Sequence, residues 1–263
     1  MKPLRCAVCI KPVPDPTRWS KLRLDPETLL LCRDEVPAVI NPLDRNAIEL
    51  ARGLGGSVSV LTMAAPDAEE HLREALAMGC DQAFLLTDKA FAGADTLATA
   101  KVLAAALRKL GELDLILCGG YSLDGSTAQV GPQVAELLGL PDLPHVFKLE
   151  FKGSGLRCHC RTDSGHAIVE AELPALVTLD KGANQPRLAS MIGIREASSK
   201  KLTVWSAKDL GLDPSQTGLR GSPTRMLGIT IPDLKRKGDV LQGSPAQAAV
   251  ELVTRLRKEK VLP

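Results

Sequence analysis

The sequence predicts an α/β fold, a doubly wound and mostly parallel sheet followed by a C-terminal arm. Three observations support this prediction. Apolar runs of strand length alternate with amphipathic helical patterns over the first 140 residues. After residue 140, two alternating segments flank glycine-containing turns, which is typical of antiparallel ribbons. From Ile194 onward the chain is polar and turn-rich. We therefore expect an α/β domain over residues 1–193 and an extended arm over residues 194–263.

The strands are predicted from short apolar runs bounded by turn signals. Residues 175–179 form an apolar run that would return to the main sheet, after antiparallel ribbons at 146–152 and 167–173. The other expected strands are residues 5–10, 57–63, 83–86 and 115–118.

The helices are predicted from apolar residues recurring every three or four positions. Asn41 and Pro42 suit the cap and first position of a helix over residues 44–54. Two further helices are expected over residues 67–78 and from 93–96 to 110, and a terminal amphipathic helix over residues 245–260. That last helix either folds back or packs on a partner, and the sequence leaves both interpretations open.

Composition excludes several classes of function. Thirty-three basic residues against 31 acidic ones, and 3% aromatic residues, argue against a nucleic-acid surface. No apolar run reaches membrane-span length, and the first residues make a poor signal peptide. Seven scattered cysteines indicate reduced thiols and a cytoplasmic protein. Cys6 and Cys9 would point to opposite faces of a strand, so no metal site is expected.

The stretch from Asp114 to Gly139 is the strongest candidate for a binding site. An apolar strand leads into a loop with glycines and hydroxyl side chains, and then into a helix that Pro132 restricts to a start near Ala128 or later. Backbone N–H groups and the helix dipole at such a junction favour a phosphate. An ordinary strand-to-helix turn would also contain glycines, but the loop is longer than such turns need. No nucleophile elbow or zinc-protease motif occurs, so no catalytic residue is expected.

Two further segments follow predicted parallel strands, namely the loop after Ile10 and the turn at 62–64. Because ligands bind at the carboxyl ends of such strands, we expect all three segments to line one crevice. An ATP-using enzyme or a nucleotide-sensing protein of similar fold remains an alternative, although the loop after Ile10 lacks the Ser-Gly-Gly pattern of ATP pyrophosphatases. A purely structural protein with an empty crevice is a third interpretation.

Six motifs in order resemble the β subunit of electron transfer flavoproteins. They are KPVPD at 11–15, NPLD at 41–44, ALAMG at 75–79, GADT at 93–96, LDGSTAQVGP at 123–132 and NQPR at 184–187. The resemblance implies a Rossmann-like, adenine-nucleotide-binding fold. It also implies a non-enzymatic electron carrier that forms a heterodimer with an α subunit holding FAD. The carrier would connect a flavin dehydrogenase, such as an acyl-CoA dehydrogenase, with a downstream oxidoreductase.

The resemblance also implies site residues. In conventional members this subunit holds AMP, whereas in the electron-bifurcating members a second FAD takes that place, and GADT and the loop look nearer to the second group. Leu43 would contact the flavin of the α subunit, and Met191 would dock the dehydrogenase. Thr96 and Thr99 would contact a second FAD. The implied nucleotide pocket comprises Cys9, Asn41, Pro42, Leu43, Asp44, Met63, Tyr121, Ser122, Leu123, Asp124, Gly125, Ser126, Thr127, Ala128, Gln129, Val130, Gly131 and Pro132.

Several positions depart from the family pattern. Gly120 and Tyr121 stand where many bifurcating members have a basic residue and Gln, and Ser126 stands where a carboxylate is common. Loss of the cation weakens the case for a pyrophosphate, whereas loss of the carboxylate relieves repulsion. Gln185 replaces the usual Glu, and Met191 replaces a docking leucine. Met is adaptable at interfaces, so docking with changed selectivity is expected.

Overall fold

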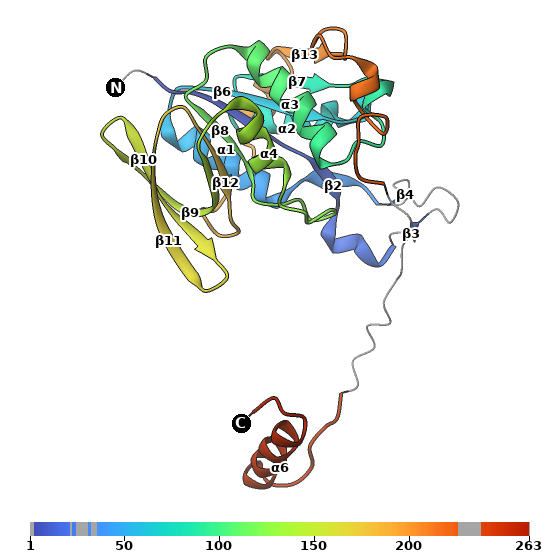
Figure 1. The fold of residues 1–263 in the computed structure, drawn as a ribbon, viewed down its shortest axis with the longest axis vertical. Coiled ribbons are helices and arrows are strands. Elements are labelled where there is room, and N and C mark those ends of the chain that lie inside the picture. Colours follow the sequence, from blue (N-terminus) through green and yellow to red (C-terminus); the bar gives the residue numbers. More distant parts are fainter. Residues whose placement is uncertain (1–2, 22, 25–30, 33–35, 226–237, 263) are drawn as a thin grey trace. The chain divides into compact units, whose positions relative to one another are not determined.

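The computed structural model describes residues 3–21, 23–24, 31–32, 36–225 and 238–262 (Figure 1). The strands are β1 (Arg5–Cys9), β2 (Pro12–Pro14), β3 (Arg23–Leu24), β4 (Leu31–Cys32), β5 (Ala38–Ile40), β6 (Ser57–Met63), β7 (Gln82–Leu86), β8 (Leu115–Gly119), β9 (Asp142–Lys152), β10 (Gly155–Thr162), β11 (Gly165–Glu172), β12 (Ala175–Leu179) and β13 (Leu202–Trp205). The α-helices are α1 (Pro42–Leu54), α2 (Glu69–Met78), α3 (Thr96–Leu110), α4 (Val130–Leu138), α5 (Met191–Ala197) and α6 (Pro245–Lys258).

Within the described residues, nine strands form one sheet in the order β11-β10-β9-β12-β8-β1-β6-β7-β13. All neighbouring pairs from β9 to β13 in this order are parallel. The chain begins in the middle, at β1, then proceeds to β6 and β7 on one side and to β8 and β12 on the other. The predicted doubly wound, mostly parallel sheet is confirmed, and its direction of winding reverses between β1 and β8.

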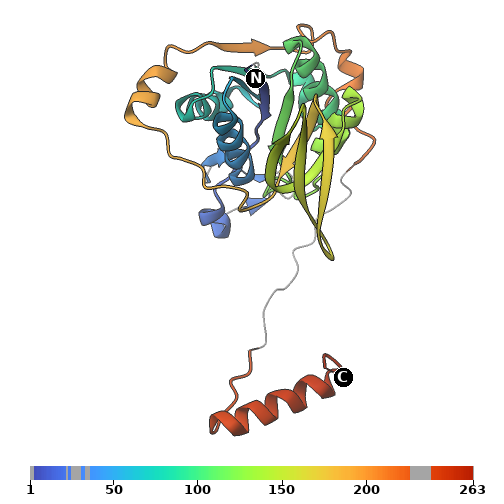
Figure 2. The same ribbon diagram turned by 90° about the vertical axis from the view of Figure 1, so that its left-hand side faces the viewer.

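Helices cover both faces of this sheet (Figure 2). Buried side chains of α1, α2 and α5 pack in one hydrophobic cluster, and those of α3 and α4 pack in another. Cys6 belongs to the first cluster and Cys9 to the second. The two thiols therefore point to opposite faces of β1, as predicted from the alternation of side chains along a strand.

The antiparallel part of the sheet is an extension at one edge (Figure 1). β9 pairs parallel with β12 and antiparallel with β10, which in turn pairs antiparallel with β11. The two expected ribbons are confirmed, and the apolar run at 175–179 does return to the main sheet. β10 was not predicted because two of its three buried side-chain positions are cysteines, alternating with arginines and a histidine.

The structure divides the chain later than residue 194, where the C-terminal arm was expected to begin. One compact unit is Met1–Met226 and the second is Leu227–Pro263. β13 pairs with β7 in the main sheet, and Trp205 lies over Phe84 with 4.6 Å between ring centroids. β13 is therefore held in the sheet by main-chain pairing with β7 and by this aromatic contact. The segment around β13 has few apolar residues, so the sequence did not predict a packed element there. Part of the expected arm, residues 226–237, lies outside the described residues.

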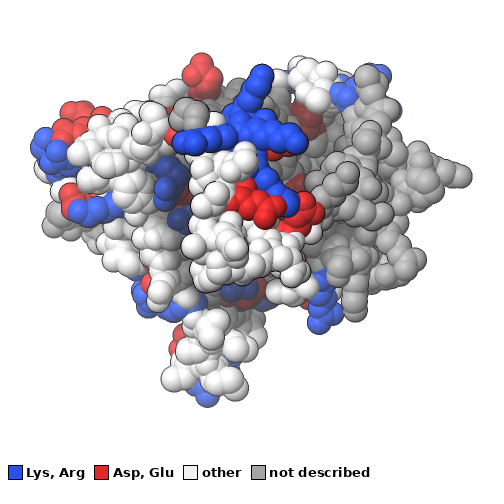
Figure 3. Space-filling model, turned by 90° about the horizontal axis from the view of Figure 1, so that it is seen from below, with Lys and Arg blue, Asp and Glu red and all other residues white. Residues whose placement is uncertain are grey.

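The terminal helix α6 confirms the amphipathic pattern predicted for residues 245–260. Ser244 caps it and forms a reciprocal capping box with Gln247. Val250, Leu252 and Val253 are exposed on it. None of the helices among the described residues is long and apolar enough to cross a bilayer. On the face drawn in Figure 3, basic side chains lie next to acidic ones.

Candidate functional site

The reversal of winding between β1 and β8 places two loops side by side. β1 and β8 are parallel neighbours, so their carboxyl ends lie at the same edge of the sheet. The chain leaves β1 at Ile10–Lys11, and leaves β8 into the 120–129 loop, which leads to α4. In doubly wound sheets a ligand binds in the crevice at such a reversal. The strand-end site is the name used below for residues 9–11, 41–44 and 119–132.

Asp44 ties the two strand ends together. It lies in the first turn of α1 and is only 4% exposed. One carboxylate oxygen accepts the backbone N–H of Lys11 at 2.8 Å, and the other accepts that of Gly119 at 2.8 Å. Burial raises the pKa of Asp44 to about 7, although both N–H groups act in the opposite direction. Because its two oxygens accept N–H groups from the two strand ends, the side chain of Asp44 holds the end of β1 next to the end of β8.

Asn41 connects the start of α1 to the 120–129 loop. It is the N-cap residue and Pro42 follows at the first helical position, as predicted, but its side chain makes no capping bond. Instead, the amide nitrogen donates to the carbonyl of Tyr121 at 3.0 Å, and the amide oxygen accepts the N–H of Leu123 at 3.3 Å. The side chain is buried. Its function in the fold is to hold the loop backbone.

Lys11 and Asp124 connect the loop after β1 with the 120–129 loop. The ammonium of Lys11 lies 2.7 Å from a carboxylate oxygen of Asp124 and 3.4 Å from the hydroxyl of Ser122. The same oxygen of Asp124 accepts the N–H of Gly125 at 2.8 Å. Burial alone would raise the pKa of Asp124, but the hydrogen bond and the charge of Lys11 outweigh it and keep the pKa below its ordinary value.

Glycine is required at both positions at the end of β8, because any side chain there would clash with its neighbours. A Cβ on Gly119 would lie 2.5 Å from the carboxylate of Asp44, and one on Gly120 would lie 2.9 Å from the imidazole of His145. His145 has a φ of +49°, and its N–H donates to the hydroxyl of Thr178 at 3.0 Å. His145 was not singled out from the sequence, since nothing local indicates that a residue of β9 reaches the end of β8.

The segment from Ser126 to Pro132 forms a cradle of backbone donors. Ser126 and Ala128 have φ values of +50° and +55°, a left-handed conformation that is uncommon outside glycine. α4 begins at Val130, with no side-chain cap, so Pro132 stands in its first turn as predicted. None of the described residues accepts a hydrogen bond from the N–H groups of Thr127, Ala128 or Gln129. Free N–H groups at a helix start attract anions.

Gly131 allows the cradle to pack closely against β12 and β8. A Cβ there would lie 2.5 Å from the methyl group of Thr178 and 3.1 Å from the sulfur of Cys118. Gly125 differs, because a Cβ there would meet its nearest neighbour, the hydroxyl of Ser122, at 3.5 Å. Gly131 is therefore required by packing, whereas a side chain at position 125 would begin at ordinary van der Waals distance from its neighbours.

Helix α3 approaches the same site through its N-terminus. Its cap, Asp95, accepts the N–H groups of Ala98 and Thr224, and its own N–H donates to Ser222. The hydroxyl of Thr96 donates to the side-chain oxygen of Gln129 at 3.0 Å. Thr99, one turn further, is half-buried. The structure thus places Thr96 next to the cradle, and the segment up to Thr224 holds the start of α3.

The remaining residues expected in the pocket differ in how far their side chains are buried. Cys9 is buried, and burial raises the pKa of its thiol to about 12. Met63 is half-buried at the end of β6, beside Thr62, whose hydroxyl is buried without a partner among the described residues. Leu43 is 2% exposed, so in this conformation its side chain has no surface for the expected contact with a flavin.

Met191 lies away from the strand-end site, at the first position of α5. It is 82% exposed, as expected, and Leu188 and Ile192 beside it are also exposed. Gly193 packs α5 directly on α2, since a Cβ there would lie 2.3 Å from the carbonyl oxygen of Ala77. Arg73 of α2 donates to the carbonyls of Ala197 and Lys200. The apolar surface around Met191 is therefore fixed to α2 by close packing and by hydrogen bonds.

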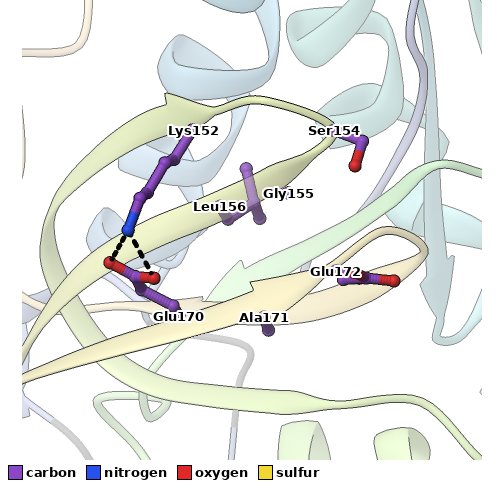
Figure 4. A pocket seen from close by; sticks show the side chains of 7 residues that line it. All are labelled: Lys152, Ser154, Gly155, Leu156, Glu170, Ala171 and Glu172. Carbon is purple, nitrogen blue, oxygen red and sulfur yellow. Dashed lines mark hydrogen bonds and ion pairs between the residues drawn. The ribbon is translucent and has the colours of Figure 1, made fainter.

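Two hollows occur elsewhere in the described structure. One, of about 280 Å³, lies on the β9–β11 ribbon, where Lys152 pairs with Glu170 (Figure 4). The other, of about 450 Å³, lies between the ends of α1 and α2 and the segment leading into α5. Neither is lined by a residue of the strand-end site, whose Ser126, Thr127 and Gln129 are exposed. No group of three potential metal ligands occurs among the described residues.

Comparison with known proteins identifies the relatives of this chain. Residues 28–210 match the family described as Electron transfer flavoprotein domain. The chain is 44% identical to the electron transfer flavoprotein subunit beta of Thermoanaerobacterium thermosaccharolyticum, over 97% of this chain and 98% of that one. It is 38% identical to the caffeyl-CoA reductase-Etf complex subunit CarD of Acetobacterium woodii, over 98% and 100%. It is 37% identical to the acryloyl-CoA reductase electron transfer subunit gamma of Anaerotignum propionicum, over 98% and 100%.

Proposed function

Because this chain belongs to the electron transfer flavoprotein β-subunit family, we propose that it forms a heterodimeric electron carrier with an α subunit. In this proposal the α subunit holds FAD, and this chain covers one side of that flavin. The strand-end site binds an adenine nucleotide, either AMP or a second FAD. The observation that carries the proposal is the cradle at 126–132, whose N–H groups at 127–129 have no acceptor among the described residues, at the reversal between β1 and β8.

The residues at the strand-end site fit a nucleotide phosphate. The donor set consists of backbone N–H groups, the hydroxyl of Thr127, and the ammonium of Lys11 nearby, whereas the hydroxyl of Ser126 donates to the carbonyl of Ser122 at 3.2 Å. This is the chemistry that anions bind at helix N-termini. When bound, FAD supplies the redox chemistry, and the residues of this chain orient the group and tune its potential. Asn41 and Asp44 hold the loop, and Thr96 holds Gln129 at the edge of the cradle.

We further propose that Met191 and its apolar neighbours dock a flavin dehydrogenase, and that a downstream oxidoreductase accepts the electrons. The full-length similarity to a subunit of a caffeyl-CoA reductase complex and to an acryloyl-CoA reductase electron transfer subunit supports a partnership of this kind. α6, with exposed Val250 and Val253, is proposed to pack on the α subunit. The scattered cysteines support a cytoplasmic setting.

The direct test is to co-express this chain with its α subunit, denature the purified complex and quantify the nucleotides that are released. One FAD and one AMP per heterodimer would indicate a single-flavin carrier. Two FAD and no AMP would place a second flavin in the strand-end site. A complex without flavin would refute the proposal.

A variant locates the nucleotide within the chain. In Gly125→Val the new Cβ would lie 3.5 Å from its nearest neighbour, an ordinary van der Waals distance, so the fold should tolerate it. We expect loss of the AMP or of the second FAD with retention of the flavin of the α subunit. Full retention of every nucleotide would favour the structural interpretation, in which the strand-end site is empty.

A further inference from the structure

The sequence of the cradle lacks a cation of its own. Residues 119–132 contain no Lys or Arg, and Gly120–Tyr121 stands where a basic residue is expected from the family resemblance. A nucleotide phosphate carries one or two negative charges, and N–H groups of a helix start contribute only partial charges to its neutralisation. Full neutralisation therefore requires a charged side chain from another segment.

The structure brings Lys11 to this place from the end of β1. Its ammonium lies 2.7 Å from Asp124 and 3.4 Å from the hydroxyl of Ser122. A Cβ on Gly125 would lie 4.0 Å from the same ammonium, so the charge is directly beside the residue that precedes Ser126. The side chain of Lys11 is 47% exposed, whereas that of Asp124 is 10% exposed.

The backbone of Lys11 is fixed while its side chain is free to change partner. Its N–H donates to Asp44, and its carbonyl accepts the N–H of Asn41 at 2.9 Å. A lysine ammonium is a point charge with three donors on a flexible stem, so it can bind a carboxylate and a phosphate at the same time or exchange one for the other. No movement of the backbone is needed for either arrangement.

We propose that Lys11 is the specificity-determining residue that selects a phosphorylated adenine compound over its nucleoside, and that Asp124 competes with the phosphate for its charge. This inference rests on the proposed function and adds the residue that recognises the phosphate. Two opposite effects follow. Removal of the Lys11 charge weakens binding of the phosphate only, and removal of the Asp124 charge strengthens it.

The experiment uses the complex of this chain with its α subunit after the nucleotide of the strand-end site has been removed by dialysis. Titration calorimetry then gives the affinities for AMP and for adenosine. We expect Lys11→Gln to weaken AMP binding between about tenfold and hundredfold, the range for one hydrogen bond between charged groups, with adenosine unchanged. Asp124→Asn should strengthen AMP binding, again with adenosine unchanged.

A matched control is Lys148→Gln on β9. Lys148 is also exposed and pairs with a carboxylate, Glu150, at 2.7 Å, but it belongs to the ribbon. Its substitution should leave both affinities unchanged. The affinity of the wild type for AMP should fall with added salt more steeply than that of Lys11→Gln.

The outcomes separate this inference from the proposed function. If the wild type binds neither AMP nor FAD in the strand-end site, both are overturned. If the wild type binds AMP but Lys11→Gln weakens AMP and adenosine equally, Lys11 only supports the loop and this inference alone is overturned. An unchanged ratio of AMP to adenosine affinity in both variants overturns it as well.

Discussion

Replacement of Asp44 by Asn should change how the stability of the protein depends on pH. Asp44 is a buried residue of the strand-end site, and burial raises the pKa of its carboxyl group from 3.8 to about 7. Between these two values the folded chain retains a proton that the unfolded chain has released. The free energy of unfolding therefore falls as the pH rises through this window, by about 1.4 kcal/mol per pH unit.

The expected change in the free energy of unfolding depends on the pH range over which unfolding is measured. From pH 5 to pH 7 the wild type should lose roughly 2–3 kcal/mol through this group. Asn does not titrate and, like the protonated carboxyl group, offers one acceptor to the N–H groups of Lys11 and Gly119. We expect Asp44→Asn to match the wild type within about 1 kcal/mol at pH 5, since one acceptor is available in both. It should be the more stable protein at pH 8.

The assay is urea unfolding followed by circular dichroism at pH 5, 6, 7 and 8, with the difference between variant and wild type taken at each pH. Asp124→Asn is the matched control. The pKa of Asp124 is held below its ordinary value of 3.8, so its contribution to stability is complete above about pH 5. The difference in stability between Asp124→Asn and the wild type should therefore be constant over this range. A constant difference for Asp44→Asn, within about 0.5 kcal/mol, would show that Asp44 is ionised throughout and that our account of its burial is wrong.

Three further substitutions test the packing of the site and of the docking surface. Gly131→Ala should destabilise the protein by about 1–3 kcal/mol and release the bound nucleotide, because the new Cβ would lie 2.5 Å from the methyl group of Thr178. The control Gly53→Ala, whose Cβ would have no atom within 4 Å, should instead stabilise helix α1 by about 0.5–1 kcal/mol in the same urea unfolding assay. Asn41→Ala should cost about 1–3 kcal/mol and accelerate proteolysis of the 120–129 loop, since two bonds to its backbone are lost, and cleavage at the wild-type rate would contradict this. Met191→Ala should slow electron transfer from the dehydrogenase without loss of flavin. The control Ile168→Ala, which changes an exposed apolar side chain on β11, should leave the transfer rate unchanged. Equal transfer rates for Met191→Ala and the wild type in stopped-flow measurements would remove Met191 from the proposed docking surface.

The sequence predicted secondary structure and exposure correctly wherever these depend on residues a few positions away in the chain. The run SVSVLTM at 57–63 has the bounds of β6, and the Asn-Pro pair marks the start of α1, because apolar periodicity and capping preferences act over a few residues. The same holds for Pro132 in the first turn of α4 and for the exposed Met191. The order of motifs along the chain also identified the family, which the comparisons confirm.

Only the tertiary structure decided what the side chains at the strand-end site do. Asn41 suits a helix cap in the sequence, yet its amide holds the backbone of a loop 80 residues away. Leu43 was expected at a flavin and is in the core, and Lys11 meets Asp124 across the reversal of the sheet. β13 joined the main sheet although its segment has few apolar residues. In each case the deciding contact is between segments distant in sequence, and since the energy of burial and of paired charges depends on those neighbours, no local pattern contains it.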